Sequence, residues 1–352
     1  MDCRFVPQSN HGKTMYTLPS IAPFDALKLE DGTYCFAHHD FWGDAPYFAW
    51  PKYVPSRRYP HDFMGYFWTY EGTQYSRLRD TKAVHDYMAL NSVFFVDGTR
   101  IDPAAVETVI PARITMNDFF KYTEKLKGAT AERIATFDLV RHLIDGGVDS
   151  DMIGVTGSIL LKGEISGFSD FDLVLYGART IEKSEKILRK LALKPNSPLY
   201  YRRKEEAIKF YHKYNVLSDL TPEEFSETFP QKVSQGIMSE IPFSIFQVPS
   251  KDEVAVLKEP ESSAFDPLSK DRFEATVEDD FYSKYTYKCL YKIKKTHDGG
   301  KIYTLYCHDR ACTEQAKNGD LVLIEASRIN DDSYVIHPKN GYIKPIKSSR
   351  LR

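Results

Sequence analysis

Two aspartates separated by one residue are the first candidates for chemistry in this chain. Asp170 and Asp172 stand at the start of a short apolar run, Leu173–Tyr176, that predicts a buried strand. Because side chains alternate along a strand, both carboxylates are expected on the same face. Like charges this close repel one another, and a bound divalent cation allows both to stay ionised. Oxygen ligands of this kind are typical of Mg²⁺, so the pair predicts a Mg²⁺ or Mn²⁺ site.

A Gly-Ser pair precedes these aspartates and supplies a second chemical element. Gly157 and Ser158 follow the apolar run Met152–Thr156, which predicts a strand, and they open a brief apolar turn or helix, Ile159–Leu161. A glycine lets the backbone come close to a ligand, while the serine hydroxyl and the first amides of a helix suit phosphate. A phosphate cradle followed by a metal-binding aspartate pair indicates nucleotidyl transfer.

Each half of this arrangement also has a purely structural interpretation. An Asp-x-Asp sequence can begin a solvated strand, and Gly-Ser is an ordinary turn. Both halves occur here in order and in a strand–turn–strand context, and this combination favours the functional interpretation.

With Gly157, Ser158, Asp170 and Asp172 in this order, the stretch resembles the DNA polymerase β-like nucleotidyltransferase superfamily. The signature of that superfamily is Gly-Ser followed by Asp-x-Asp on the next strand. More loosely, the whole layout is similar to archaeal-type predicted nucleotidyltransferases, in which the catalytic domain lies between an aromatic-rich N-terminal segment and a C-terminal β segment.

The resemblance implies Mg²⁺-dependent transfer of a nucleoside monophosphate from an NTP to a hydroxyl acceptor, with release of pyrophosphate. Asp170 and Asp172 are then the catalytic and metal-binding residues, and Gly157 and Ser158 bind the NTP phosphates. Lys162 and Arg179 are further candidates for neutralising phosphate charge.

The third carboxylate that the superfamily typically carries on a later strand is not evident. The next predicted strand, Ile241–Val248, offers Ser244 on its face, with Glu240 before it and Asp252 and Glu253 after it. Without a third acid, the metal that activates the attacking hydroxyl is expected to be weakly held. A nucleotide- or RNA-binding protein that keeps the fold but does little chemistry therefore stays as the alternative.

The composition sets broader limits. The chain has 352 residues, is 42% hydrophobic and has a formal net charge of −2, which fits two or three domains and indicates no global attraction to nucleic acid or membrane. No apolar run approaches the length of a membrane span, and the first residues lack an apolar signal segment, so a soluble cytoplasmic protein is expected. The signatures of P-loop NTPases, zincins and α/β-hydrolases are missing.

Five cysteines without CxxC spacing predict free thiols in a reducing compartment. Cys307-His308 with Cys312 could begin a metal site, but no second ligand pair stands at zinc spacing, and strand-buried thiols are favoured.

The pattern predicts a three-part α+β protein. Residues 1–115 are expected to form an aromatic-rich α+β domain, and residues 116–257 are expected to form a mixed-sheet nucleotidyltransferase domain. Residues 258–271 are rich in Pro, Ser and acidic residues, which predicts a linker. Residues 272–352 are expected to form a small β-barrel of about five strands, for which an OB-like form is considered. Other expected elements are the helices Thr81–Leu90, Asn117–Gly128, Thr130–Asp145 and Cys312–Lys317, and the strand Ser92–Val96.

Aromatic residues surround Arg57-Arg58 in the N-terminal domain, among them Trp50, Tyr53, Tyr59 and Trp68. Interleaved arginines and aromatic rings can stack on single-stranded nucleic acid. The core of a small β domain needs the same residues, and this interpretation is favoured.

The C-terminal part carries a charge asymmetry. From Phe281 to Arg352 there are 14 Lys and Arg against 7 Asp and Glu, which gives this region +7 and the remainder −9. Tyr285, Tyr287 and Tyr291 share one face of a predicted strand, either as a platform for RNA or as the barrel core, and the sequence leaves both open. RNA is the first expected acceptor, and a protein side chain or a small molecule remains open.

Overall fold

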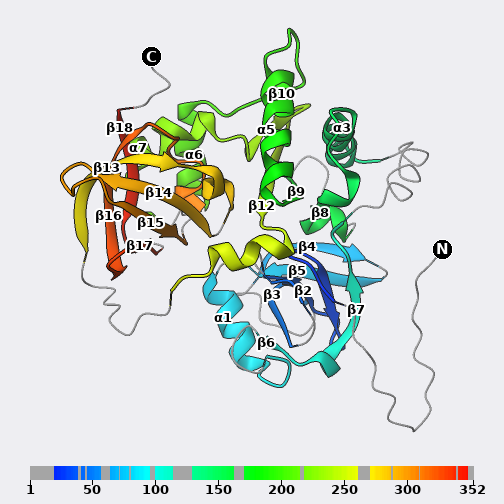
Figure 1. Ribbon diagram of the computed structural model, residues 1–352. Helices are drawn as coiled ribbons and strands as arrows, with labels where there is room; N and C mark the ends of the chain where they lie inside the picture. Colours follow the sequence, from blue (N-terminus) through cyan, green and yellow to red (C-terminus); the bar gives the residue numbers. More distant parts are fainter. Residues whose placement is uncertain are drawn as a thin grey trace.

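The computed structural model describes residues 20–38, 41–43, 46–56, 64–70, 72–78, 81–95, 100–113, 129–161, 170–214, 218–260, 270–286, 288–308, 310–337 and 340–347. These residues form a mixed α+β structure with three separate β-sheets (Figure 1). Among them, no helix combines the length and the apolar character that crossing a membrane requires.

The N-terminal sheet has the strand order β4-β5-β3-β2-β1-β7, with β6 paired to β3. Its elements are β1 (Ala26–Leu29), β2 (Tyr34–Ala37), β3 (Tyr47–Pro55), β4 (Met64–Tyr70), β5 (Thr73–Leu78), α1 (Thr81–Leu90), β6 (Arg100–Ile101), the 3₁₀ helix η3 (Pro103–Ala105) and β7 (Val106–Ile110). Of the residues considered for a stacking platform, Tyr53 is fully buried and Trp50 packs against a buried cluster, which supports the core interpretation. Arg57, Arg58 and Tyr59 lie outside the described residues.

The central sheet is mixed, with the order β10-β11-β12-β9-β8. Strand β9 pairs antiparallel with β8 and parallel with β12, so it lies in the middle. The elements are α3 (Ala131–Asp145), η4 (Ser150–Met152), β8 (Ile153–Thr156), α4 (Gly157–Leu160), β9 (Phe171–Tyr176), α5 (Ala178–Ala192), β10 (Leu199–Tyr200), α6 (Lys204–Tyr214), α7 (Pro222–Thr228), η5 (Phe229–Gln231), β11 (Gln235–Met238), β12 (Ile241–Val248) and η6 (Lys251–Leu257).

The C-terminal strands close into a five-stranded barrel. The order β13-β14-β15-β17-β16 returns to β13, and β18 is added outside this ring through β16. All contacts in the ring are antiparallel except that between β15 and β17, which is parallel. The elements are β13 (Asp271–Asp279), η7 (Phe281–Lys284), β14 (Cys289–Lys295), β15 (Ile302–Cys307), η8 (Arg310–Cys312), β16 (Leu321–Asn330), β17 (Ser333–Ile336) and β18 (Tyr342–Lys347).

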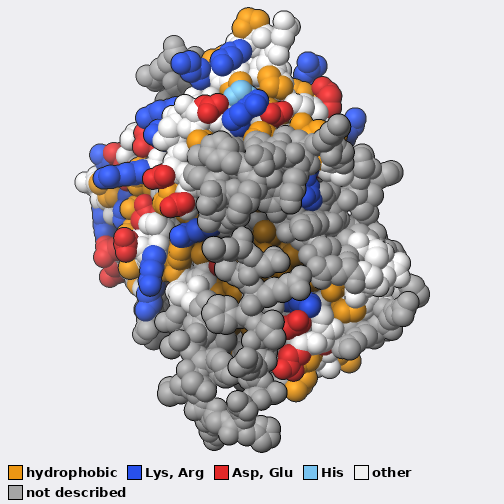
Figure 2. Space-filling view, turned by 90° about the vertical axis from the view of Figure 1, so that its right-hand side faces the viewer, with side chains coloured by type: hydrophobic (Ala, Val, Ile, Leu, Met, Phe, Trp, Pro, Cys, Tyr) orange, Lys and Arg blue, Asp and Glu red, His pale blue; other side chains and the backbone are white. Residues whose placement is uncertain are grey.

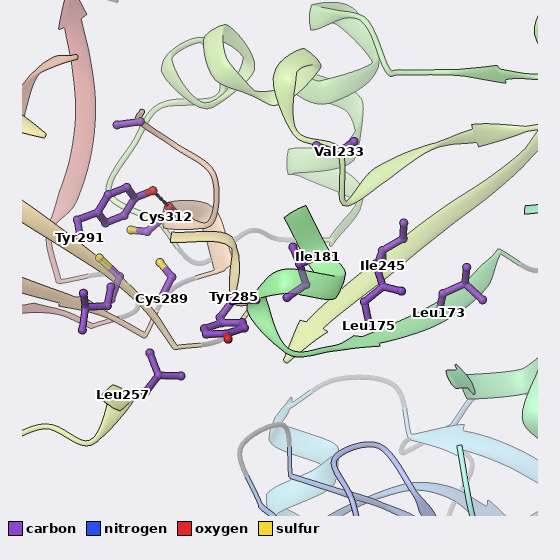
Figure 3. Packing of buried hydrophobic residues seen from close by; sticks show 14 of the residues in the cluster. Leu173, Leu175, Ile181, Val233, Ile245, Leu257, Tyr285, Cys289, Tyr291 and Cys312 are labelled. Atoms are coloured by element: carbon purple, nitrogen blue, oxygen red, sulfur yellow. Dashed lines mark hydrogen bonds between the residues drawn. The ribbon is translucent and has the colours of Figure 1, made fainter. Parts of the chain in front are cut away.

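The barrel and the central sheet share one hydrophobic core. Figure 3 shows Leu175, Ile181 and Ile245 of the central domain in the same cluster as Tyr285 and Cys289 of the barrel. Hydrogen bonds cross the junction as well, because the backbone amide of Gln247 donates to Oγ1 of Thr286 at 2.8 Å. The predicted boundary at 258–271 therefore separates two sheets but not two cores.

Several predicted elements are confirmed. Helix α1 has the predicted bounds, Thr130 caps α3 by accepting a hydrogen bond from the amide of Arg133, and β12 spans the predicted residues. Tyr285 and Tyr291 are buried, which favours the core interpretation over an RNA platform, but β14 begins at Cys289, so Tyr285 precedes the strand predicted to carry both. Tyr287 and the predicted helix Asn117–Gly128 lie outside the described residues.

Two predicted elements are wrong. Ser92–Phe95 is not a strand, because the side chain of Asn91 binds the carbonyl of Tyr87 and a turn follows α1. Cys312–Lys317 is not a helix, because Glu314 has a left-handed backbone (φ +55°) that ends the short 3₁₀ helix η8.

Cys289, Cys307 and Cys312 are buried, and none of them forms a disulfide with another described cysteine. In the part of the chain that the structure describes, no group of three or more His, Cys, Asp and Glu side chains is arranged to hold a metal ion. Burial raises the pKa of the Cys307 thiol, which favours its neutral form.

On the face shown in Figure 2, basic and acidic side chains are intermixed over the described surface and form no single charged patch. This mixing agrees with the small formal net charge of the chain.

Candidate functional site

The two faces of the central sheet have different surroundings. On β9, Phe171, Leu173 and Leu175 pack in the core with residues of α3 and α5. Val174 and Tyr176 point to the opposite side, where they pack with N-terminal residues such as Ala22. Asp172 shares the alternation of Val174 and Tyr176, so its carboxylate belongs to the face that the N-terminal sheet covers. In Figure 1 this face lies between the central and N-terminal sheets.

Gly157 lies directly beside the Asp172 carboxylate. Thr156, the last residue of β8, pairs with Asp172 across the antiparallel ladder, and the chain turns at Gly157 with φ +68°. A Cβ atom on Gly157 would lie 2.9 Å from Oδ2 of Asp172 and 3.7 Å from Nζ of Lys52. Glycine is favoured here, because any side chain would be strained by the left-handed backbone and would crowd the Asp172 carboxylate.

Three side-chain cations from two other parts of the molecule lie near enough to Asp172 to interact with its charge. Lys52 of β3, Arg77 of β5 and Arg310 of η8 all interact electrostatically with Asp172. The ammonium of Lys52 lies over two buried aromatic rings, 5.2 Å from the centroid of Phe36 and 5.5 Å from that of Tyr53. The aromatic N-terminal strands therefore hold Lys52 at the edge of the central sheet.

The charges in this site perturb one another. Burial, and then the charge of Asp170, raise the pKa of Asp172 to about 6, while Lys52 and the two arginines oppose this rise. Burial lowers the pKa of Lys52, and the charges of Asp172 and Asp170 counteract that effect. Burial thus disfavours the charged form of both groups, and the opposite charge of the other group favours it.

The donor set fits a single hard divalent cation. Asp170 directly precedes β9 and Asp172 is its second residue, both are only partly buried, and they are close enough for their charges to interact. Two carboxylates beside the backbone of Gly157 are the kind of protein ligands that Mg²⁺ takes when water and phosphate supply the rest, so Asp170 and Asp172 are the residues that would hold such an ion.

Ser244 occupies the position next to Asp172 on the neighbouring strand. In the parallel ladder between β12 and β9, Ser244 pairs with Asp172, and its side chain is 9% exposed. The strand position at which the superfamily resemblance leads one to look for a third carboxylate therefore carries a hydroxyl.

The remaining predicted site residues lie in different places. Ser158 is buried in the first turn of α4, next to Gly157. Arg179 is exposed in the first turn of α5, beyond the far end of β9 from Asp172, so the structure does not bring it to the aspartates. Lys162 lies outside the described residues.

Sequence reasoning did not find Lys52, Arg77 or Arg310, because they are far from the Gly-Ser and Asp-x-Asp stretch along the chain. One signal was available for Lys52, which is the single charged residue in the aromatic strand YFAWPKYVP. Such a residue needs a partner when its strand is buried.

Comparisons of the chain with protein-family models, with curated proteins and with solved structures find no match.

Proposed function

We propose that the protein is a Mg²⁺- or Mn²⁺-dependent nucleotidyltransferase that moves a nucleoside monophosphate from an NTP to a hydroxyl acceptor. The observation that carries this proposal is the closeness of Gly157, the residue after β8, to the Asp172 carboxylate of the paired strand β9, since an added Cβ on Gly157 would lie 2.9 Å from Oδ2. It joins a backbone suited to phosphate with a carboxylate suited to metal at one point of the sheet.

Asp170 and Asp172 hold the cation in this proposal. A bound divalent cation polarises the triphosphate and neutralises charge that develops as pyrophosphate leaves. The acceptor oxygen attacks the α-phosphorus, the bond from the α-phosphorus to the bridging oxygen breaks, and the hydroxyl proton passes to solvent.

Lys52 and Arg77 bind the β- and γ-phosphates, together with Ser158. The support is the position of the Lys52 ammonium beside Gly157 and the electrostatic interaction of both cations with Asp172. In formal charge, the carboxylates of Asp170 and Asp172 are outnumbered by the three basic side chains Lys52, Arg77 and Arg310. With a divalent metal ion added, the site is positive and attracts the negatively charged triphosphate.

RNA is the proposed acceptor. The strand order of the barrel, with a closed ring and one parallel contact between β15 and β17, is compatible with an OB-like barrel, a class that often binds oligonucleotides. The excess of Lys and Arg after Phe281 provides the charge that a phosphate backbone attracts.

One observation favours a second candidate, which is a nucleotide- or RNA-binding protein with little or no transfer activity. Ser244 stands where a third carboxylate would complete a two-metal site. A site that lacks this ligand can bind a nucleotide without activating an acceptor hydroxyl.

The deciding experiment incubates the protein with each of four α-³²P-labelled NTPs, Mg²⁺ or Mn²⁺, and total cellular RNA. The matched control is the Asp170→Asn/Asp172→Asn variant, which keeps the size of both side chains. Label on RNA, on the protein or on a small molecule with the wild type alone supports transfer and identifies both base and acceptor. No label with any NTP, from wild-type protein that binds RNA or NTP, supports the binding function instead.

A further inference from the structure

A guanidinium from the barrel lies on the side of Asp172 where the third carboxylate is replaced. Arg310, the first residue of η8, stacks over Phe246 with 5.1 Å between its Cζ and the ring centroid. Phe246 is two residues beyond Ser244 on β12, so both side chains point to the same face of the sheet. Arg310 also interacts electrostatically with Asp172.

One nitrogen of the guanidinium is shielded from solvent. Nη2 of Arg310 is buried, and it has no hydrogen-bond partner among the described residues. An arginine stays protonated in proteins, so this buried N–H group is costly unless an acceptor oxygen reaches it. A phosphate oxygen in the site is such an acceptor.

The turn that carries Arg310 is fixed to the central domain. Nζ of Lys232 donates to the carbonyl of Ala311 at 2.7 Å, and both partners are buried. The buried carboxylate of Glu314 accepts from Oγ of Ser234 at 2.9 Å. The carbonyl of Ser234 in turn accepts from the amide of Ile245 on β12. These hydrogen bonds therefore hold the turn that carries Arg310 in a defined position beside β12.

We propose that Arg310 contacts the α-phosphate of the bound NTP and replaces the second metal ion that a third carboxylate on β12 would hold. This inference rests on the proposed nucleotidyl transfer. Transfer then uses one divalent cation at Asp170 and Asp172 and one guanidinium supplied by the barrel. Arg310 stabilises the negative charge on the non-bridging oxygens of the α-phosphate and stays protonated, while the acceptor proton leaves to water.

The first test counts metal ions. Mn²⁺ binding is measured by electron paramagnetic resonance in the presence of α,β-methylene-ATP and, in separate samples, the corresponding GTP, CTP and UTP analogues. The expected wild-type result is one Mn²⁺ per chain without magnetic coupling. A coupled pair of Mn²⁺ ions in the wild type, which two metals about 4 Å apart produce, overturns the inference without affecting the proposed transfer.

The second test uses substitutions. Arg310→Met is expected to lower kcat by about 10²–10³-fold with little change in KM, the typical loss when one donor to a developing charge is removed. Arg310→Lys is expected to keep part of the activity. Ser244→Asp/Arg310→Met is expected to bind a coupled pair of Mn²⁺ ions and to regain part of the lost kcat.

The control is Arg328→Met, which removes an exposed arginine of the same barrel that binds Asp331 and the carbonyl of Asn330 on the surface. Wild-type kcat in Arg310→Met, together with transfer that still requires Asp170 and Asp172, overturns the inference and leaves the proposed function standing. Wild-type protein that neither transfers label nor binds Mn²⁺ with any analogue overturns both.

Discussion

Lys52 and Asp172 belong to different sheets, yet Gly157 lies against both of their charged groups, 2.9 Å from the carboxylate and 3.7 Å from the ammonium when measured from the position of an added Cβ. This relationship joins the N-terminal sheet to the motif on β8 and β9. It also converts an aspartate pair that could be a surface feature into a site with charges of both signs.

Removing the Lys52 charge should weaken nucleotide binding. Lys52→Met keeps the length and apolar stem of the side chain but removes the ammonium. We expect the Kd for NTP to rise about 10–100-fold, because a hydrogen bond to a charged group contributes about 1.5–3 kcal/mol. Isothermal titration calorimetry measures the change. Lys82→Met, at an exposed lysine on α1 of the same domain, serves as the control, and equal affinities in the two variants would contradict the assignment of Lys52.

A substitution at Gly157 should separate backbone strain from loss of the site. Gly157 and Gly72 both have left-handed backbones, with φ +68° and +77°, but an added Cβ on Gly72 meets nothing within 4 Å. Alanine at either position should cost about 1–2 kcal/mol of stability. Only Gly157→Ala should also abolish Mn²⁺-dependent NTP binding. Urea unfolding and calorimetry check the two effects, and retained binding in Gly157→Ala would argue against a ligand between these groups.

Without metal at neutral pH, the ionised carboxylate of Asp172 should make the wild-type protein less stable than a variant with a neutral side chain at this position. The pKa of Asp172 is raised to about 6 in the folded state, so the folded protein holds this proton more tightly than the unfolded chain. The stability that protonated Asp172 contributes relative to the unfolded chain is therefore lost as pH rises from about 4 to about 6. In EDTA at pH 7, Asp172→Asn should stabilise the protein by an amount on the order of 2 kcal/mol, and the difference should shrink towards pH 4.

Mg²⁺ should reverse this difference, since it binds only the wild type. Thermal unfolding at several pH values, with and without Mg²⁺, measures both effects. Asp149→Asn is the control, because Asp149 is exposed and its side chain caps no amide. A wild-type protein that is more stable than Asp172→Asn in EDTA at pH 7 would contradict this account.

The hydrogen bonds that join the barrel to the central domain through Glu314 should contribute to the stability of the protein. This buried carboxylate accepts hydrogen bonds from Oγ of Ser234 and from the amides of Ser234 and Val233. Glu314→Ala leaves these buried donors without an acceptor, so we expect a loss of about 1–3 kcal/mol in the free energy of unfolding. Glu278→Ala, at an exposed position of β13, should change it by less than about 0.5 kcal/mol. Equal unfolding free energies for the two variants would show that the hydrogen bonds of Glu314 do not stabilise the junction.

The parts of the structure that could be predicted are those whose signals are local. The cap at Thr130, the bounds of α1 and β12, and the order of strand, Gly-Ser turn and Asp-x-Asp strand all follow from neighbouring residues. The helix predicted at Cys312–Lys317 failed because Glu314 and Gln315 make their bonds to the central domain, and no local pattern reveals these partners.

Only the residues of the Gly-Ser and Asp-x-Asp motif could be predicted as part of the candidate site from the sequence. Gly157, Ser158, Asp170 and Asp172 carry their own signal, whereas Arg77 and Arg310 reach the site through the packing of three sheets. The distance of Arg179 from the aspartates could be inferred from the sequence, because the predicted strand Leu173–Tyr176 places Arg179 at the opposite strand end from Asp172.

The core shared by the barrel and the central sheet has a consequence for how the chain folds and how it can be divided. Because residues of both sheets belong to one hydrophobic cluster, neither sheet can complete its interior alone. Chemical denaturation should then give a single cooperative transition for residues 129–347, and a fragment that ends at Lys258 should expose apolar surface and aggregate. The barrel is thus not a module that can be exchanged between proteins, as the composition of residues 258–271 alone would imply.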